Sequence, residues 1–508
     1  MKNTIPGIWS AALVGVIFCG NALADIQPAS PFTDHMVLQR DMPVPIWGKA
    51  TVGKVVQVSF AGQSKSVEVD KAGEWRVTLD PIAGTSDPAT LTIQTEDGGD
   101  EVKFADVVVG DVWICSGQSN MQMGAGAAPE IKVLFEQAKG IRSFAVKRTV
   151  AFTEQDALEG EWAVGAPDSA VACSFAYHLR QSIDVPVGII LTAWGSSSIE
   201  AWMPRDMTES LPHFKTIMEE WDADVEGHER IEAALNQEKW SRDDDVYMRR
   251  QSSIVYNAMI KPLAPYACRG LVWYQGERNT RFITGMPEEP QYMRVAGILE
   301  YDETLLAWMQ RYREEWERDD FHFLVVMLPG YGQILDSGPE GDEESPDTHS
   351  WAWMRETQMK ALELPHTGVA NTIDLGDVKN IHPKDKLPIG QRLALLAERD
   401  TLGRDLVAQG PVMKQVDPQS EKLVVHFDFA DGLKTLDGAP PAGFWLSDDS
   451  RKWHRAEAKV DGETVVLGSS EVKNPLYVRY AFAGKPKVNL VNGAGLPAYP
   501  FRSDQFEP

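Results

Sequence analysis

A serine between polar residues stands where an apolar segment ends. Residues 111–121 read Asp-Val-Trp-Ile-Cys-Ser-Gly-Gln-Ser-Asn-Met, a stretch of strand length that runs into a small, polar turn. Such a turn at the end of a buried strand holds the hydroxyl of Ser119 at the edge where open α/β sheets bind ligands. The preceding glycine lets the backbone turn sharply, and the N–H of Ser119 can help to stabilise an oxyanion. Ser119 is therefore a candidate nucleophile, with an ordinary turn as the alternative.

Three later apolar segments end in residues that would complete a site around this serine. One ends at Gly195, whose backbone N–H is unobstructed by a side chain. Another ends at Gln275, a side-chain amide donor. The last leads into a loop that holds His382, a candidate general base. A nucleophile, two donors and an imidazole at four strand ends together indicate nucleophilic catalysis more strongly than any one of them does.

These motifs resemble those of the sialate O-acetylesterase family of SGNH-type hydrolases. The resemblance is carried, in this order, by Gly117-Gln-Ser-Asn-Met121, Trp273-Tyr-Gln-Gly-Glu277 and Ile381-His-Pro383. The opening segment 36–48 and the ending 495–502 also resemble the family, so that nearly the whole mature chain is covered. The resemblance implies an α/β fold with an SGNH-type, mostly parallel sheet flanked by helices.

The resemblance also implies a role for each site residue. Ser119 would be the nucleophile and His382 its general base. The oxyanion hole would consist of the Ser119 N–H, the Gly195 N–H and the side chain of Gln275. The implied reaction is removal of O-acetyl groups from sugars through an acyl-enzyme, and this mechanism needs no metal and no other cofactor.

The histidine loop departs from the family pattern. The family commonly has Asp two residues before the histidine, whereas this chain has Asn380. An asparagine can orient an imidazole but cannot neutralise the imidazolium that forms during the reaction. Three interpretations stay open: a Ser–His dyad, a carboxylate supplied by Asp377 or Glu277, or a weakened enzyme.

Other side chains are candidates for contact with substrate. Arg278 follows the glutamate at a position where the family usually has a small residue, and its cation could pair with a sugar carboxylate or face solvent. Trp194 belongs to a group of aromatic residues near the expected strand ends, where sugars stack on such rings, although core packing is the default explanation. Arg355, on a predicted helix that begins near residue 351, is a further candidate.

The first 24 residues predict a secretory signal peptide. A positive residue, an apolar stretch and an Ala-Leu-Ala site follow one another there, and we expect cleavage before Asp25. The mature protein would then be periplasmic or secreted. No other stretch approaches the length of a membrane span.

The remaining chain divides by pattern into three parts. Short alternating strands over 25–105 predict an N-terminal β-sandwich-like domain. Alternating strands and helices over 106–404 predict the SGNH-type catalytic domain, with a helical insertion near 205–250 that could roof the site. Residues 405–508 return to an alternating pattern and predict a second β-sandwich-like domain.

The charge limits the class of partner. The formal net charge is −25, which argues against nucleic acid or an anionic membrane. The resemblance, rather than the charge, implies an acetylated carbohydrate as the partner, with sialic acid or a related glycan as the sugar, and oligomeric state is not predicted. The alternatives are an acetyl esterase of a plant polysaccharide such as xylan or xyloglucan, and a non-catalytic glycan-binding pseudoenzyme.

Overall fold

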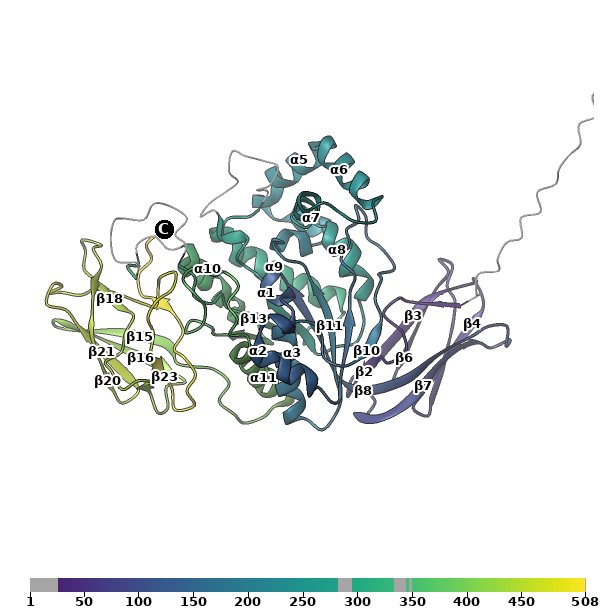
Figure 1. Ribbon diagram of the computed structural model, residues 1–508, viewed down its shortest axis with the longest axis horizontal. Helices are drawn as coiled ribbons and strands as arrows, with labels where there is room; N and C mark the ends of the chain where they lie inside the picture. The colour runs from purple at the N-terminus through teal and green to yellow at the C-terminus, as the bar shows by residue number, and fades with distance from the viewer. Residues whose placement is uncertain (1–25, 282–294, 333–343, 347–349, 508) are drawn as a thin grey trace, which may run out of the picture.

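The computed structural model describes residues 26–281, 295–332, 344–346 and 350–507. The predicted signal peptide and its cleavage site before Asp25 lie outside these residues. Figure 1 shows three parts along the longest axis, with the N-terminal β strands at one end, an α/β body in the middle and the C-terminal β strands at the other end.

A mostly parallel sheet runs through the α/β body in the order β10-β9-β11-β8-β12-β13-β14. Neighbouring strands from β9 to β14 are parallel, and only β10 pairs antiparallel, with β9. Strands such as β12 and β13 are buried along their whole length, which explains why they read as continuous apolar runs rather than as alternating ones. The expected α/β fold class is confirmed. The strands are β8 (Glu101–Gly117), β9 (Ile141–Ala145), β10 (Trp162–Val164), β11 (Val187–Ala193), β12 (Gly270–Tyr274), β13 (His322–Val326) and β14 (Thr367–Ala370).

Helices flank this sheet, and their ends follow from local sequence. Helix α3 (Ala170–Ser182) begins where the hydroxyl of Ser169 accepts a hydrogen bond from the N–H of Ala172. Helix α11 (Leu387–Leu402) packs against α3 and ends at Gly403, whose φ of 63° is the left-handed conformation that favours glycine. The other helices of the body are α1 (Ser119–Gln122), α2 (Pro129–Glu136), α8 (Ile254–Met259), α9 (Ile298–Glu315) and α10 (Ser350–Met359).

Strand β8 joins the N-terminal β region to the mostly parallel sheet of the α/β body. Its first six residues alternate in burial and its last eleven are buried, so one strand changes from a half-exposed to a fully buried environment. The N-terminal part pairs with β7 and β2, and the C-terminal part pairs with β11 and β12. The boundary suggested at residue 105 therefore falls inside a continuous strand. The strands before it are β1 (Ile26–Pro28), β2 (Val37–Gln39), β3 (Val44–Ala50), β4 (Val55–Phe60), β5 (Gln63–Glu68), β6 (Glu74–Leu79) and β7 (Thr85–Thr95).

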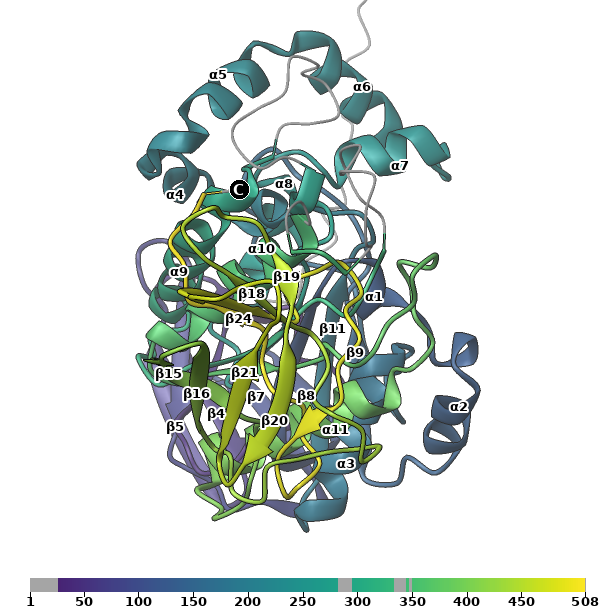
Figure 2. The ribbon, with the colours of Figure 1, turned by 90° about the vertical axis from the view of Figure 1, so that its left-hand side faces the viewer.

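The segment near 205–250 is helical, as expected. Figure 2 shows its helices as an arc over one end of the body. They are α4 (Arg205–Ser210), α5 (Lys215–Ala223), α6 (Val225–Leu235) and α7 (Arg242–Met248). Among residues 26–281, 295–332, 344–346 and 350–507, no helix is long and apolar enough to cross a membrane.

The C-terminal part consists of antiparallel sheets. One has the order β15-β16-β21-β20, a second has the order β19-β18-β22-β24, and β17 pairs with β23. The strands are β15 (Val412–Gln419), β16 (Lys422–Asp428), β17 (Lys434–Thr435), β18 (Phe444–Ser447), β19 (His454–Arg455), β20 (Glu457–Asp461), β21 (Thr464–Gly468), β22 (Tyr477–Tyr480), β23 (Leu490–Val491) and β24 (Phe501–Arg502).

A buried carboxylate connects the N-terminal strands to the body. Asp111, in the middle of β8, accepts hydrogen bonds from Arg40 Nε at 3.0 Å and Nη2 at 2.8 Å, and from Arg269 Nε at 2.9 Å. Burial raises the pKa of Asp111, but the two guanidinium groups outweigh it and hold this pKa below its ordinary value. Arg40 follows β2 and Arg269 precedes β12, so the carboxylate links both regions to β8.

We expect Asp111→Ala to lower the free energy of unfolding by about 3 kcal/mol, because two largely buried guanidinium groups lose their buried carboxylate partner and keep only the more exposed Asp41. Urea denaturation followed by tryptophan fluorescence measures this change. Asp87→Ala, which removes an exposed carboxylate on β7, is the matched control and should change stability by less than about 0.5 kcal/mol. Equal stability of the two variants would contradict the linking role of Asp111.

Candidate active site

The serine turn depends on a glycine at the end of β8. Gly117 has a φ of 138°, and a Cβ placed on it would lie 2.1 Å from the carbonyl oxygen of Tyr274. The next N–H, that of Gln118, donates to the same carbonyl oxygen at 3.0 Å. Ser119 then begins helix α1, where the first N–H groups have no acceptor within the helix. The turn therefore fixes the Ser119 hydroxyl beside a backbone donor.

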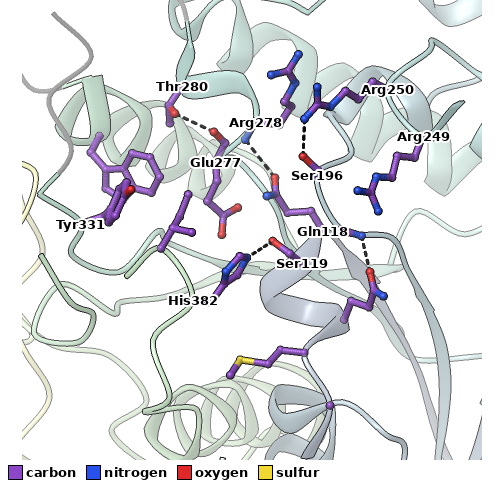
Figure 3. A pocket seen from close by; sticks show the side chains of 16 residues that line it. Gln118, Ser119, Ser196, Arg249, Arg250, Glu277, Arg278, Thr280, Tyr331 and His382 are labelled. Atoms are coloured by element: carbon purple, nitrogen blue, oxygen red, sulfur yellow. Dashed lines mark hydrogen bonds between the residues drawn. The ribbon is translucent and has the colours of Figure 1, made fainter. Parts of the chain in front are cut away.

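The histidine predicted as the base lies against this serine. Ser119 Oγ and His382 Nε2 are 2.8 Å apart, although 263 positions separate the residues in the chain (Figure 3). Partial burial and the nearby Lys386 cation both lower the pKa of His382 below its ordinary value. The imidazole is therefore held neutral, the form that accepts the serine proton, over a wider pH range than an ordinary histidine.

None of the three candidate partners of His382 is hydrogen-bonded to its ring among the described residues. Asn380 accepts the backbone N–H of His382 on its side-chain oxygen at 2.9 Å, and Asp377 accepts the N–H of Asn380 at 2.8 Å. Glu277 accepts a hydrogen bond from Asn120 at 2.5 Å. In the part of the chain that the structure describes, no carboxylate is hydrogen-bonded to the His382 ring. Asn380 and Asp377 thus shape the backbone of the loop that carries the imidazole.

The Gly195 N–H faces the pocket but already has an acceptor. It donates to the side-chain oxygen of Gln122 at 2.5 Å. A Cβ placed on Gly195 would lie 3.2 Å from the Cβ of Ser119, so this N–H is next to the serine. An ester carbonyl oxygen that used the Gly195 N–H would have to replace the Gln122 oxygen. Gln122 was not predicted from the sequence, and its spacing of three from Ser119 on one helix is the signal that could have identified it.

The structure does not place the Gln275 side chain in the pocket. This residue is fully buried, and its Nε2 donates to the side-chain oxygen of Asn279 at 2.8 Å. Its Oε1 accepts the hydroxyl of Tyr301 at 2.8 Å. Its longer contacts, at 3.3 Å, reach Gln118 and Ser197. The amide that the family resemblance assigns to the oxyanion hole is therefore directed into interior packing here.

A cavity of about 580 Å³ surrounds the Ser119–His382 pair and is rich in arginine. Arg249 and Arg250 follow helix α7 of the insertion, and Arg278 comes from the loop after β12. In Figure 3 the Arg249 side chain extends toward the Ser119 end, whereas that of Arg278 extends away from it. The cavity is lined by Gln118, Ser119, Gln122, Met123, Gly124, Gly195, Ser196, Arg249, Arg250, Glu277, Arg278, Thr280, Tyr331, Trp351, Ile381 and His382.

Two side chains predicted as substrate contacts, those of Trp194 and Arg355, are buried and are not among the residues that line the cavity. Trp194 is fully buried, stacks on Trp240 with ring centroids 5.7 Å apart, and donates its indole N–H to Asp245 at 3.0 Å. Arg355 is fully buried on α10, where Nη1 donates to the carbonyl oxygen of Ala483 at 2.7 Å. Its remaining hydrogen bonds go to the carbonyl oxygens of Leu328, Pro329 and Gly484. Arg355 therefore connects the body to the C-terminal part.

Comparison with known proteins identifies the family to which the chain belongs. A family model described as "Carbohydrate esterase, sialic acid-specific acetylesterase" matches residues 109–237. A crystal structure of a carbohydrate acetylesterase from Xanthomonas citri is 32% identical, covers 94% of this chain and 100% of its own, and superposes with a TM-score of 0.78. The chain belongs to the sialate O-acetylesterase family of carbohydrate esterases. It is thus a carboxylic ester hydrolase, and the family supports removal of O-acetyl groups from sugars.

The mammalian relatives match over most of their length. Sialate O-acetylesterase of Rattus norvegicus is 27% identical, with 90% of each chain covered. Sialate O-acetylesterase of Homo sapiens is 26% identical, with 84% of this chain and 81% of that protein covered. The similarity therefore extends over the β strands at both ends as well as the α/β body.

We expect Arg355→Met to destabilise the protein by about 3 kcal/mol or more, because four buried carbonyl groups each lose a hydrogen bond, although those of Pro329 and Gly484 keep a second donor. The KM for an acetyl ester should stay within about twofold, since Arg355 is outside the pocket. Urea denaturation and steady-state kinetics measure the two effects. Lys360→Met, at an exposed position just after α10, is the control. A raised KM without loss of stability would restore Arg355 as a substrate contact.

Proposed function

We propose that this protein is a secreted carbohydrate O-acetylesterase that removes O-acetyl groups from sialic acids or related acidic sugars by a Ser119–His382 acyl-enzyme mechanism. The observation that carries the proposal is the 2.8 Å contact between Ser119 Oγ and His382 Nε2 at the base of a solvent-open pocket. Residues 1–24 are proposed to direct secretion. Residues 25–105, 106–404 and 405–508 are proposed to form the N-terminal, catalytic and C-terminal domains, with strand β8 running from the first into the second.

The proposed reaction has two halves. His382 takes the proton of Ser119 as the hydroxyl oxygen attacks the acetyl carbonyl carbon. The Ser119 N–H and the Gly195 N–H stabilise the tetrahedral oxyanion once the substrate oxygen has replaced that of Gln122. The imidazolium then gives its proton to the departing sugar hydroxyl. Water, activated by His382, hydrolyses the acetyl-serine and releases acetate.

The proposed catalytic pair works without an acidic residue on the imidazole. The side chain of Asn380 accepts the backbone N–H of His382 and so fixes the loop that positions the imidazole. Within the described chain it provides no hydrogen bond to the ring that would compensate the charge of the imidazolium. The lowered pKa of His382 fits this arrangement, because it reflects an environment that favours the neutral imidazole. We therefore propose that the site works as a Ser–His dyad, without a third, acidic residue.

The charge of the pocket supports an acidic sugar as substrate. The protein has a net charge of −25. The described residues that line the cavity, in contrast, include three arginines and one glutamate, and no lysine or aspartate. A local cluster of cations in an acidic protein attracts an anion at short range. Arg249, which is paired with Asp245 at 3.0 Å and extends toward Ser119, is the proposed contact for a sugar carboxylate.

The central test is loss of the serine hydroxyl. We expect Ser119→Ala to lower acetate release by about 10⁴-fold or more, because no acyl-enzyme can form. Acetate is measured by coupled assay with the purified mature protein. Ser196→Ala is the matched control, since Ser196 lines the same pocket but is hydrogen-bonded to Arg250 at 2.8 Å. If Ser119→Ala keeps full activity while the fold is intact, the proposed mechanism is wrong.

The substrate class is tested by comparing an acetylated sialic acid with acetylated xylan or xyloglucan oligosaccharides. We expect preference for the sialic acid, and Arg249→Met should raise its KM about tenfold while the KM of the neutral esters is unchanged. Preference for the neutral polymers would keep the mechanism and assign the enzyme to plant polysaccharides. No acetate from any of these esters would support the pseudoenzyme.

A further inference from the structure

The side chain of Asn120 joins the two loops that carry the catalytic pair. Its Nδ2 donates to the carbonyl oxygen of Ile381 at 3.0 Å and to Glu277 Oε1 at 2.5 Å. Its Oδ1 accepts a hydrogen bond from Lys386 Nζ at 2.6 Å. Asn120 is adjacent to Ser119 in the chain, and Ile381 is adjacent to His382. One amide therefore connects the serine turn, the histidine loop and the loop after β12.

Lys386 is an unusual residue to find under this site. It is completely buried directly before α11, and its ammonium lies 5.2 Å from the ring centre of Tyr274. Burial lowers its pKa to about 8, against the opposing effect of the Glu277 and Asp385 carboxylates. A buried ammonium is costly unless it is hydrogen-bonded and paired. Here the Lys386 ammonium donates a hydrogen bond to the Asn120 amide, which in turn donates one to the Glu277 carboxylate.

Glu277 completes this arrangement from the opposite side. Only 5% of its surface is exposed, and burial raises its pKa, while the hydrogen bond from Asn120 and the Lys386 charge oppose that rise. One carboxylate oxygen bonds to Asn120, and the other is buried without a hydrogen-bond partner in the described ranges. The ammonium and the carboxylate thus lie on either side of one amide, whose orientation they both fix.

We propose that Lys386 is a positioning residue of the active site, which through the Asn120 amide locks the serine turn to the histidine loop. The inference rests on the proposed Ser119–His382 mechanism. It assigns to a buried cation the orienting task that an acidic residue performs in a Ser-His-Asp triad. Lys386 orients the Asn120 amide, and that amide binds the carbonyl oxygen of Ile381, next to His382. Lys386 therefore helps to place the imidazole without a direct hydrogen bond to it.

The position of the ammonium has a second consequence for His382. Its positive charge disfavours the imidazolium, which keeps the base neutral at lower pH. The other charged residues of its own loop are Asp377, Lys379, Lys384 and Asp385, and the charged residues that line the same cavity are Glu277 and Arg278 after β12 and Arg249 and Arg250 after α7. Loss of the Lys386 charge should therefore move the acidic limb of the kcat/KM profile to higher pH.

Lys386→Met tests the proposal in the full mature chain. We expect kcat for an acetyl ester to fall about 100-fold with KM within about threefold, because the reacting groups lose their alignment. The acidic limb of kcat/KM should move upward by about half a pH unit or more. Lys384→Met is the matched control, since it removes the same charge from an exposed position two residues away, where water weakens its effect on the imidazole. It should leave both kcat and the acidic limb close to those of the parent.

Lys386→Gln separates the two effects and guards against a variant that fails to fold. Glutamine keeps a donor for Asn120 but carries no charge, so we expect a kcat loss of about tenfold or less together with the same upward move of the acidic limb. Urea denaturation confirms that each variant is folded. Folded Lys386→Met with unchanged kcat and an unmoved limb would overturn the proposal, even if Ser119→Ala is inactive. Full activity of Ser119→Ala would instead overturn the mechanism itself.

Discussion

The site depends on the close approach of two backbone segments at the end of β8. Gly117 lies so near the carbonyl oxygen of Tyr274 that no side chain fits, and the Gln118 N–H binds that same oxygen. This contact ends the strand and turns the chain sharply enough to start α1 at Ser119. Since β8 begins among the N-terminal strands and passes the Asp111 link, the serine stands at the end of a strand anchored at several points.

Buried charge is the second constraint on the site. Lys386 and Glu277 are both taken out of water within the catalytic body, which is costly for each alone. The Asn120 amide between them accepts a hydrogen bond from the ammonium on one side and donates one to a single oxygen of the carboxylate on the other. Such an arrangement is sensitive to the removal of any member, because the remaining charge would be left uncompensated. This sensitivity suits a device that fixes geometry rather than one that adds stability.

The sequence could predict the elements and the proximity of Ser119 to His382 because both follow from local rules. Apolar runs that end in small polar residues indicate strand ends, and parallel strands bring those ends to one edge. That reasoning located Ser119, Gly195 and His382, and the structure brings them together. The family resemblance supplied the same residues independently. The helical insertion was likewise visible as a charged segment between two apolar runs.

The direction of side chains could not be predicted, because tertiary neighbours set it. Gln275 stands at a strand end, yet Asn279 and Tyr301 draw its amide inward. Arg355 reads as a free cation on a helix, but its acceptors include carbonyl groups about 130 residues further along the chain. Asn120 belongs to the serine motif, whereas its partner Lys386 is 266 positions away. A single sequence carries no local signal for such contacts.

The most direct test of the proposed Ser119–His382 mechanism is to identify the nucleophile by covalent labelling. The purified mature protein is treated with a fluorophosphonate, which reacts with activated serines, and the modified peptide is located by mass spectrometry. We predict one label, on Ser119, and its loss in His382→Ala, because the hydroxyl is then no longer activated. A label on a different serine would contradict this prediction. Full acetate release after Ser119 has been labelled would contradict it as well.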